Sequence, residues 1–258
     1  MPLKKHIPNL LTLANLTCGV LACIAVLAEG RLAMATLLVL AGAVFDFFDG
    51  FAARLLRVSG EMGKQLDSLA DMVTFGMVPS VTVYALLRLQ MPHFTWLNDN
   101  TWLTFAPMLI AVFSAYRLAK FNIDTRQSES FIGMPTPANA LFWMAIPMVV
   151  FQSALATDPS GNSIADFQSG ELLAHPAILI GGSVMMSLLM VSELPLIALK
   201  FKHFKLKGNE WRYAFLIASN SALGVAGMVL KNVFAGIPVV ILLYLVISTL
   251  SYRKSPRK

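Results

Sequence analysis

Residues 46–71 read DFFDGFAARLLRVSGEMGKQLDSLAD, a stretch that holds four aspartates in two closely spaced pairs. Asp46 and Asp49 are three positions apart, and Asp67 and Asp71 are four positions apart. In a helix, these spacings place both members of a pair on one face. A turn between the pairs would fold two helices antiparallel, so that the four carboxylates face one another. Converging carboxylates repel unless cations bind between them, and oxygen ligands suit Mg²⁺, Mn²⁺ or Ca²⁺ better than zinc.

The composition around this stretch is typical of a membrane protein. Of the 258 residues, 57% are hydrophobic and only 13% are charged, and the mean hydropathy is +0.68. Soluble domains contain about 25% charged residues, so these values exclude an ordinary cytosolic globule and a disordered chain. The apolar runs are also too long and continuous for barrel strands. We therefore predict an all-α integral membrane protein.

Long apolar runs predict a bundle of about eight transmembrane helices. We place them at residues 7–28, 32–53, 68–89, 102–120, 138–157, 174–199, 213–230 and 233–251. A spanning helix needs about 20 mostly apolar residues, and these runs are of that order. The connections between them are short, which favours a single membrane domain over residues 1–258. The longest polar stretch, residues 157–171, is predicted to be a loop.

The distribution of basic residues predicts the orientation in the membrane. If the N-terminus is cytoplasmic, the cytoplasmic helix ends hold every Lys and Arg except Arg31, Arg88 and Lys231. Cytoplasmic loops of membrane proteins carry such an excess. We therefore expect both termini and the stretch 46–71 on the cytoplasmic side, in the cytoplasmic membrane if the source is bacterial. The net charge of +6 then reflects topology, and no basic face for nucleic acid is expected.

Small and basic residues accompany the aspartates. Gly50, Ala53 and Gly63 would let a bulky ligand approach the backbone closely, and Arg54 adds positive charge suited to phosphate. Carboxylates, divalent metal and basic groups together suggest phosphoryl-type transfer. The first predicted helix also carries polar residues spaced by three, Asn9, Thr12 and Asn15. These three could either hydrogen-bond between helices or form the polar wall of a cavity.

The spacing of these residues matches a family signature. The string D-x2-D-G-x2-A-R-x8-G-x3-D-x3-D is typical of the CDP-alcohol phosphotransferases, and all of its fixed positions are present within residues 46–71. The resemblance implies a membrane bundle whose first six helices enclose a polar cavity open to the cytoplasm, usually as a homodimer. It implies a catalytic core at residues 1–200, followed by two further helices and a basic tail at 201–258. It also implies that an alcohol replaces CMP on a CDP-linked donor.

The resemblance also implies roles for individual residues. Three aspartates would hold two divalent ions, Mg²⁺ or Mn²⁺ with Ca²⁺ also able to occupy the site: Asp46, Asp49 and Asp67. Asp71 would lie at the second ion and act as general base on the acceptor hydroxyl. The donor, CDP-diacylglycerol, would be bound by Asn9, Thr12, Gly50, Ala53, Arg54 and Gly63.

Three further segments resemble the phosphatidylserine synthase branch of this family. They are DSLADMVTFGMVP at 67–79, YRLAKFN at 116–122 and FIGMPTPA at 131–138. The resemblance implies transfer of the phosphatidyl group from CDP-diacylglycerol to L-serine, which gives phosphatidylserine and CMP. Relatives with phosphorylated acceptors often hold arginine where this chain has Asn15, and a neutral side chain fits serine. The candidate acceptor or phosphate residues are Asn15, Thr74, Arg117, Lys120 and Pro135.

Other interpretations stay open at this point. Arg117 and Lys120 could instead anchor a helix end at the cytoplasmic surface. Another acceptor, such as glycerol phosphate, inositol phosphate or choline, would use the same four aspartates. A divalent-ion transporter is a more remote alternative, because the acids cluster at one surface and the sequence has no second copy of the motif.

Overall fold

The computed structural model describes residues 6–58, 60–124, 131–155, 172–197 and 209–254. The longer helices in this part of the chain are α1 (His6–Leu27), α2 (Leu32–Leu56), α3 (Glu61–Asp71), α4 (Val78–Gln90), α6 (Met108–Ile123), α7 (Thr136–Leu155), α9 (Pro176–Val191), α10 (Glu210–Val229) and α11 (Gly236–Lys254). A π-helical segment, Met72–Met77, joins α3 to α4 without a break, and short helical turns including α5 (Thr95–Asp99) connect α4 to α6. The predicted all-α bundle is confirmed.

The apolar runs of the sequence explain these helices. Within the described residues, five helical stretches are long and apolar enough to cross a bilayer: His6–Leu27, Leu32–Leu56, Glu61–His93, Thr101–Ile123 and Val233–Tyr252. Two shorter apolar helices, Thr136–Phe151 and Pro176–Val191, accompany them. The chain is therefore an integral membrane protein. Helix α10, predicted as a span at 213–230, is not among these candidates; its sequence includes several polar residues.

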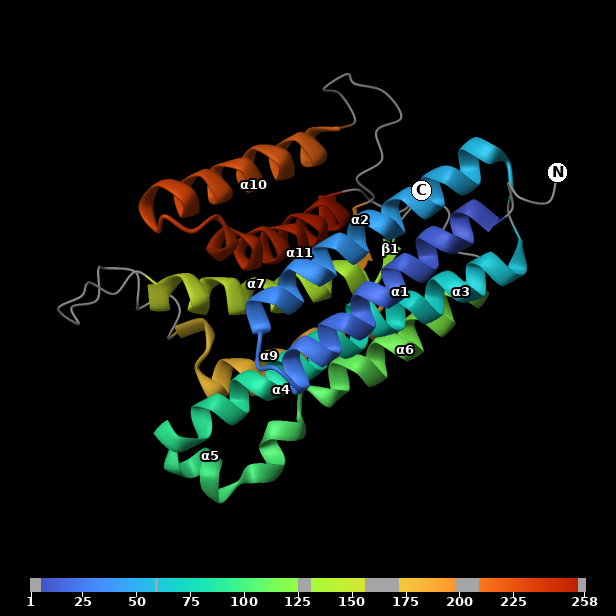
Figure 1. Cartoon of the computed structure of the whole chain (residues 1–258). Coiled ribbons are helices and arrows are strands. Elements are labelled where there is room, and N and C mark those ends of the chain that lie inside the picture. The colour runs from blue at the N-terminus through green and yellow to red at the C-terminus, as the bar shows by residue number, and fades with distance from the viewer. Residues whose placement is uncertain (1–5, 59, 125–130, 156–171, 198–208, 255–258) are drawn as a thin grey trace.

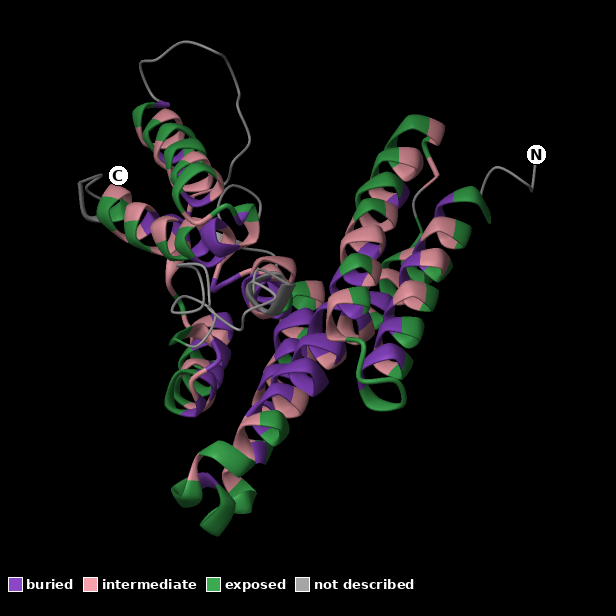
Figure 2. Ribbon diagram, turned by 60° about the vertical axis from the view of Figure 1, so that its left-hand side comes forward, coloured by how far each residue is buried: buried purple, intermediate pink, exposed green. Residues whose placement is uncertain are grey.

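The helices pack as one bundle in which α7 contacts both α2 and α11. Helix α1 lies between α2 and α3 and packs against both, while α10 and α11 lie side by side next to α7 (Figure 1). The largest core joins α4, α6, α7 and α9, with Leu87, Ile110, Trp143 and Met186 fully buried. Buried positions concentrate in these central helices, whereas the peripheral helices expose apolar side chains such as Phe47 and Leu55 (Figure 2). Such exposure fits a lipid environment.

Close backbone contacts fix the position of α1. A Cβ atom built on Gly19 would lie 2.5 Å from Thr74 Oγ1, and one on Gly42 would lie 2.8 Å from Thr74 Cγ2. Both distances are too short for a real side chain, so α1, α2 and the π-helical segment touch through their glycines. The hydroxyl of Thr74 also donates to the carbonyl oxygen of Asn15 at 3.1 Å. These contacts set the depth of α1 relative to the aspartates.

Several predicted boundaries are wrong. The third helix begins at Glu61, before the predicted 68, because the chain turns at Arg57 (φ 53°) and an extended Gly60 starts the new helix. The fourth span, predicted at 102–120, agrees with the observed Thr101–Ile123, although it opens with a 3₁₀ turn and α6 starts only after Pro107.

The predicted sixth helix, 174–199, is also too long. Helix α9 ends at Val191, and strand β2 (Pro195–Leu196) pairs antiparallel with β1 (Phe131–Ile132). Pro195 has no amide hydrogen to continue a helix, which explains the early end. The predicted loop at 157–171 and the end of the fifth span lie outside the described residues, as does most of the basic cluster after residue 198.

Candidate active site

Three of the four predicted aspartates meet at one point. Asp46 and Asp49 project from α2, and Asp67 projects from α3 on the other side of α1. One carboxylate oxygen from each of the three lies within 4.8 Å of the others. Asp49 is only 6% exposed, and the other two are partly buried. We call these three residues the acidic triad.

Asp71 lies one helical turn beyond Asp67 and is only 8% exposed. Its Oδ1 accepts a hydrogen bond of 3.2 Å from the Asn15 side-chain amide of α1. The side chain of Asp46 reaches both Asp67 and Asp71, so the fourth aspartate adjoins the acidic triad without being part of it. The sequence spacing thus brings four carboxyl groups together in a chain with few charges.

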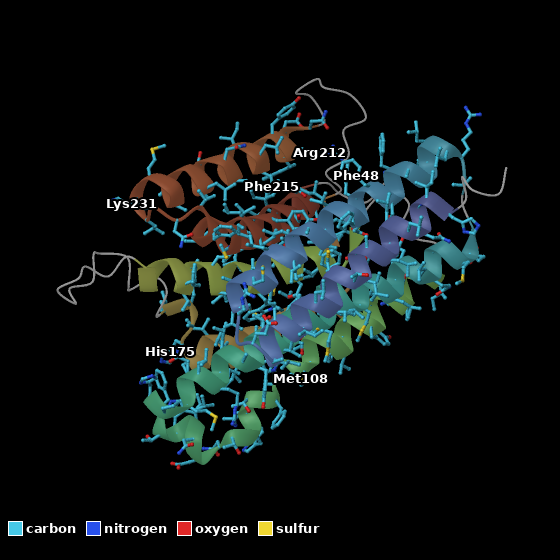
Figure 3. All side chains as sticks on the ribbon, viewed as in Figure 1. Phe48, Met108, His175, Arg212, Phe215 and Lys231 are labelled. Atoms are coloured by element: carbon cyan, nitrogen blue, oxygen red, sulfur yellow. The ribbon has the colours of Figure 1, made fainter. Side chains whose placement is uncertain are left out.

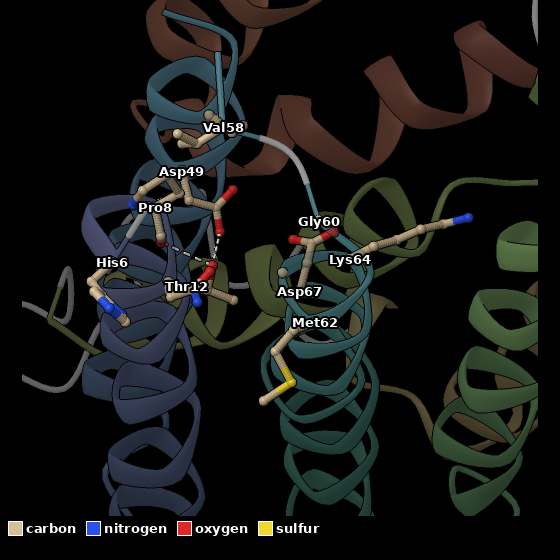
Figure 4. Close-up of a pocket in the computed structure, with 13 residues that line it drawn as sticks. His6, Pro8, Thr12, Asp49, Val58, Gly60, Met62, Lys64 and Asp67 are labelled. Atoms are coloured by element: carbon tan, nitrogen blue, oxygen red, sulfur yellow. Dashed lines mark hydrogen bonds between the residues drawn. The ribbon is translucent and has the colours of Figure 1, made fainter. Parts of the chain in front are cut away.

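Helix α1 supplies the polar partners of these acids. Thr12 Oγ1 lies 2.5 Å from Asp49 Oδ2 and 3.1 Å from the carbonyl oxygen of Pro8 (Figure 4). Asn15 is fully buried, and its Oδ1 has no hydrogen-bond partner among the described residues. The polar face of the first helix therefore forms hydrogen bonds to neighbouring helices and also forms part of a cavity wall. The sequence pattern alone leaves both roles open.

A cavity of about 460 Å³ opens beside the acidic triad. Asp49 and Thr12 face Asp67 across it (Figure 4). Five predicted donor-binding residues line it: Asn9, Thr12, Gly50, Ala53 and Gly63. The remaining lining residues are His6, Pro8, Asp49, Val58, Gly60, Met62, Lys64 and Asp67.

Two basic residues near this cavity differ in position. Arg54, the sixth predicted donor residue, does not line the cavity, but its guanidinium lies about 3.8 Å from where a Cβ of Gly50 would stand. It is therefore at the cavity edge. Lys64 lines the cavity with its stem, whereas its amine donates to the carbonyl oxygen of Asn122 at 2.8 Å and points away (Figure 4).

The candidate acceptor residues fall into two places. Asn15 and Thr74 are buried together beside Asp71. Pro135 precedes α7, and its carbonyl oxygen accepts a hydrogen bond from the Asn139 amide at 3.0 Å. It does not line the cavity beside the acidic triad.

Arg117 and Lys120, the other two candidate acceptor residues, lie on α6. Arg117 is 8% exposed, donates from Nη1 to Thr136 Oγ1 at 3.1 Å, and interacts electrostatically with Asp71 and Tyr244. Lys120 Nζ lies 3.8 Å from Glu193 Oε1. A small cavity of about 10 Å³, the size of one water, lies between them and the end of α9. Arg117 is thus buried in the bundle and is more than a surface anchor.

The ligand atoms that the acidic triad offers suit a hard divalent cation. All are carboxylate oxygens, which suit Mg²⁺, Mn²⁺ and Ca²⁺. Among the described residues, no lysine or arginine forms an ion pair with these aspartates. A cation at this point would therefore offset their mutual repulsion, and the triad could bind a metal ion.

Comparison with known proteins agrees with this geometry. The family model described as CDP-alcohol phosphatidyltransferase matches residues 5–250. The chain belongs to this family. A CDP-diacylglycerol–serine O-phosphatidyltransferase of Bacillus subtilis (strain 168) is 32% identical over 206 residues, which are 80% of this chain and 95% of that protein.

Other members of the phosphatidyltransferase family match over a shorter part of the chain. A CDP-diacylglycerol–serine O-phosphatidyltransferase of Helicobacter pylori (strain J99) is 36% identical over 136 residues, 52% of this chain and 54% of that protein. An archaetidylserine synthase of Methanothermobacter thermautotrophicus is 31% identical over 153 residues, 58% of this chain and 61% of that protein. The predicted family membership is confirmed.

Some residues of this phosphatidyltransferase site were not predicted from the sequence. His6 and Met62 line the cavity but stand in no motif. Thr136 lies in a segment that was singled out, yet its bond to Arg117 joins residues 19 positions apart. Tyr244 looks like any aromatic residue of an apolar helix, and only the fold brings it within electrostatic range of Arg117.

Proposed function

We propose that this protein transfers the phosphatidyl group of CDP-diacylglycerol to the hydroxyl of L-serine and so makes phosphatidylserine and CMP. The observation that carries the proposal is the acidic triad, of which Asp49 and Asp67 line the 460 Å³ cavity, with Asp71 buried next to it. The serine acceptor is supported by the Bacillus subtilis relative, whose length this chain matches almost throughout.

In this proposal the cavity takes the cytidine nucleotide of the donor. Gly50, Ala53 and Gly63 leave room along α2 and α3, because their side chains are absent or small. Arg54 at the cavity edge is placed to meet a donor phosphate. Asn9 and Thr12 of α1 add polar groups to the cavity lining.

The acidic triad is proposed to hold two divalent ions, Mg²⁺ or Mn²⁺, with Asp71 also at the second ion. Bound ions would neutralise the negative charge on the phosphate oxygens of the donor. Thr12 fixes one carboxylate of the triad by its short hydrogen bond to Asp49.

Asp71 is the proposed general base. It takes the proton of the serine hydroxyl, and the serine oxygen attacks the phosphorus that bears the diacylglycerol. The bond between this phosphorus and the CMP oxygen breaks, and CMP leaves with the electron pair. The Asn15 amide donates to one oxygen of Asp71 and so orients its carboxyl group. Arg117, which interacts with Asp71, is proposed to face the serine carboxylate, with Lys120 nearby.

The arrangement of the whole chain is part of the proposal. Both termini and the cavity face the cytoplasm, where serine and CMP are found. Residues 1–200 form the six-helix catalytic core and 201–258 add two helices and a basic tail. Two copies associate as a homodimer.

A CMP-release assay on purified protein in detergent tests the proposed reaction. It contains CDP-diacylglycerol and Mn²⁺ or Mg²⁺, with L-serine, glycerol 3-phosphate, inositol phosphate or choline as acceptor, and EDTA as control. We expect CMP release that requires serine, stops with EDTA and yields a new aminophospholipid. Release with a different alcohol alone would keep the family chemistry and overturn the serine acceptor.

A further inference from the structure

The last helix of the chain reaches toward the proposed acceptor site. Tyr244 of α11 is 7% exposed, and its hydroxyl donates to the carbonyl oxygen of Ile197 at 3.0 Å. Ser248, one turn later, is 1% exposed, and its Oγ accepts the amide of Ile197 at 3.2 Å. Two side chains of α11 therefore hold both backbone polar groups of one residue, immediately after strand β2.

The neighbouring helix braces this contact. Phe215 of α10 lies between α10 and α11 (Figure 3), and its ring centroid is 5.6 Å from that of Tyr244. Phe215, Tyr244 and Leu196 form one buried cluster. The phenol ring of Tyr244 is thus fixed by packing, and its hydroxyl is fixed by Ile197.

Strand β2 transmits this anchoring to the start of α7. It pairs with β1, and the Gly133 amide donates to the carbonyl oxygen of Leu194 at 2.9 Å. Gly133 has φ +74°, and a Cβ there would collide with the carbonyl oxygen of Met190, so only glycine fits this crossing. The segment that leads into α7 is therefore held tightly against the end of α9.

Arg117 is the residue on which these contacts converge. Its Nη1 donates to Thr136, the first residue of α7, which stands just after the anchored segment. Arg117 also lies within electrostatic range of both Tyr244 and Asp71. Its Nε is buried and has no hydrogen-bond partner among the described residues. Because the hydrogen bond to Thr136 orients the guanidinium of Arg117, the position of Thr136 determines where the guanidinium points.

We propose that Tyr244 and Ser248 are positioning residues that hold Arg117 in the direction needed for the carboxylate of the acceptor. The inference rests on the proposed function, in which Arg117 faces the serine carboxylate. It makes the last two helices part of the acceptor site, although they lie outside the signature at 46–71. They act through Ile197, β2, β1 and Thr136.

The kinetics of Tyr244→Phe in the full-length protein test this inference. The change removes the hydroxyl and leaves the ring, so the Ile197 carbonyl loses its donor while the packing stays. We expect the KM for L-serine to rise about fivefold, the effect of one ordinary hydrogen bond, with the KM for CDP-diacylglycerol and the Tm unchanged. Tyr252→Phe is the matched control, since Tyr252 lies on the same helix and is 46% exposed.

Ser248 provides a second, independent variant. Ser248→Ala removes the acceptor for the Ile197 amide and should also raise the KM for serine, whereas Ser248→Thr keeps a hydroxyl and should restore it. An unchanged serine KM in both Tyr244→Phe and Ser248→Ala overturns the inference. An equal rise in both KM values with a lower Tm also overturns it, because that pattern reflects general loosening. A wild-type protein that does not use serine overturns the proposed function itself and this inference with it.

Discussion

At the scale of single residues, the four aspartates break the pattern of an otherwise apolar chain. Acids within membrane helices are unfavourable, by up to about 2.5–3.5 kcal/mol each at the helix centre. The chain holds only 14 acidic residues, and four of them meet at one site. Such a cost is typical of residues that a function requires. The four aspartates are expected to have different tasks, which substitutions can separate.

Asp71→Asn removes the proposed base and keeps the size of the side chain. We expect kcat to fall by about 10²–10⁴-fold, the usual contribution of a general base, with binding of CDP-diacylglycerol retained. Steady-state CMP release and a binding measurement with the same donor check this. Asp99→Asn, at an exposed position of α5, is the control and should leave both values unchanged. Full activity in Asp71→Asn would rule out Asp71 as base.

Thr12→Val removes the hydroxyl that bonds to Asp49 and keeps the branched shape. Loss of a partner behind a metal ligand weakens metal binding by about 10–100-fold. We expect the Mn²⁺ concentration for half-maximal activity to rise about tenfold or more. Thr17→Val, on the same helix, is the control, because Thr17 bonds only to the carbonyl oxygen of Leu13. An identical Mn²⁺ titration for Thr12→Val and wild type would show that this hydrogen bond does not support a metal ligand.

At the scale of elements, the contact of α1 with the π-helical segment positions Asn15 and Asp71. Gly19→Ala would place a methyl group 2.5 Å from Thr74 Oγ1 and 3.0 Å from its Cα. Overpacking of this kind costs about 1–3 kcal/mol, so we expect a lower Tm together with reduced activity. Gly181→Ala on α9 is the control, since nothing lies within 4 Å of its added Cβ. A Tm equal to that of wild type in Gly19→Ala would contradict the close packing.

The sequence predicted most helices because their apolar runs are long. It missed the first turns of α3 because Glu61, Gly63 and Lys64 read as a polar loop, whereas in the fold this segment lines the cavity. It also missed β1 and β2, since two-residue strands that pair across more than 60 positions leave no periodic pattern.

The candidate site was predictable to the extent that it depends on local spacing. The intervals within 46–54 and 63–71 place carboxylates on helix faces, and the structure brings the acidic triad together. The partners of Arg117 come from α7 and α11, and their distance in sequence explains why only the fold reveals them. Their roles in serine binding stay predictions.

At the scale of the whole molecule, the excess of basic residues predicts which end of the bundle faces the cytoplasm. Met62 and Trp102 stand near opposite ends of the bundle and are 71% and 69% exposed. In a background with both native cysteines changed to alanine, a membrane-impermeant maleimide should label Met62→Cys only in inside-out vesicles. It should label Trp102→Cys only in right-side-out vesicles. The opposite pattern would reverse the predicted topology and place the cavity outside.

The most direct test of the central claim follows the oxygen atom of the acceptor. Purified wild-type protein receives CDP-diacylglycerol, Mn²⁺ and L-serine labelled with ¹⁸O in its hydroxyl group, and mass spectrometry examines both products. If the serine oxygen attacks the lipid phosphorus, the label appears in phosphatidylserine. The released CMP then carries no label. Absence of labelled phosphatidylserine, or label found in CMP, would contradict this mechanism.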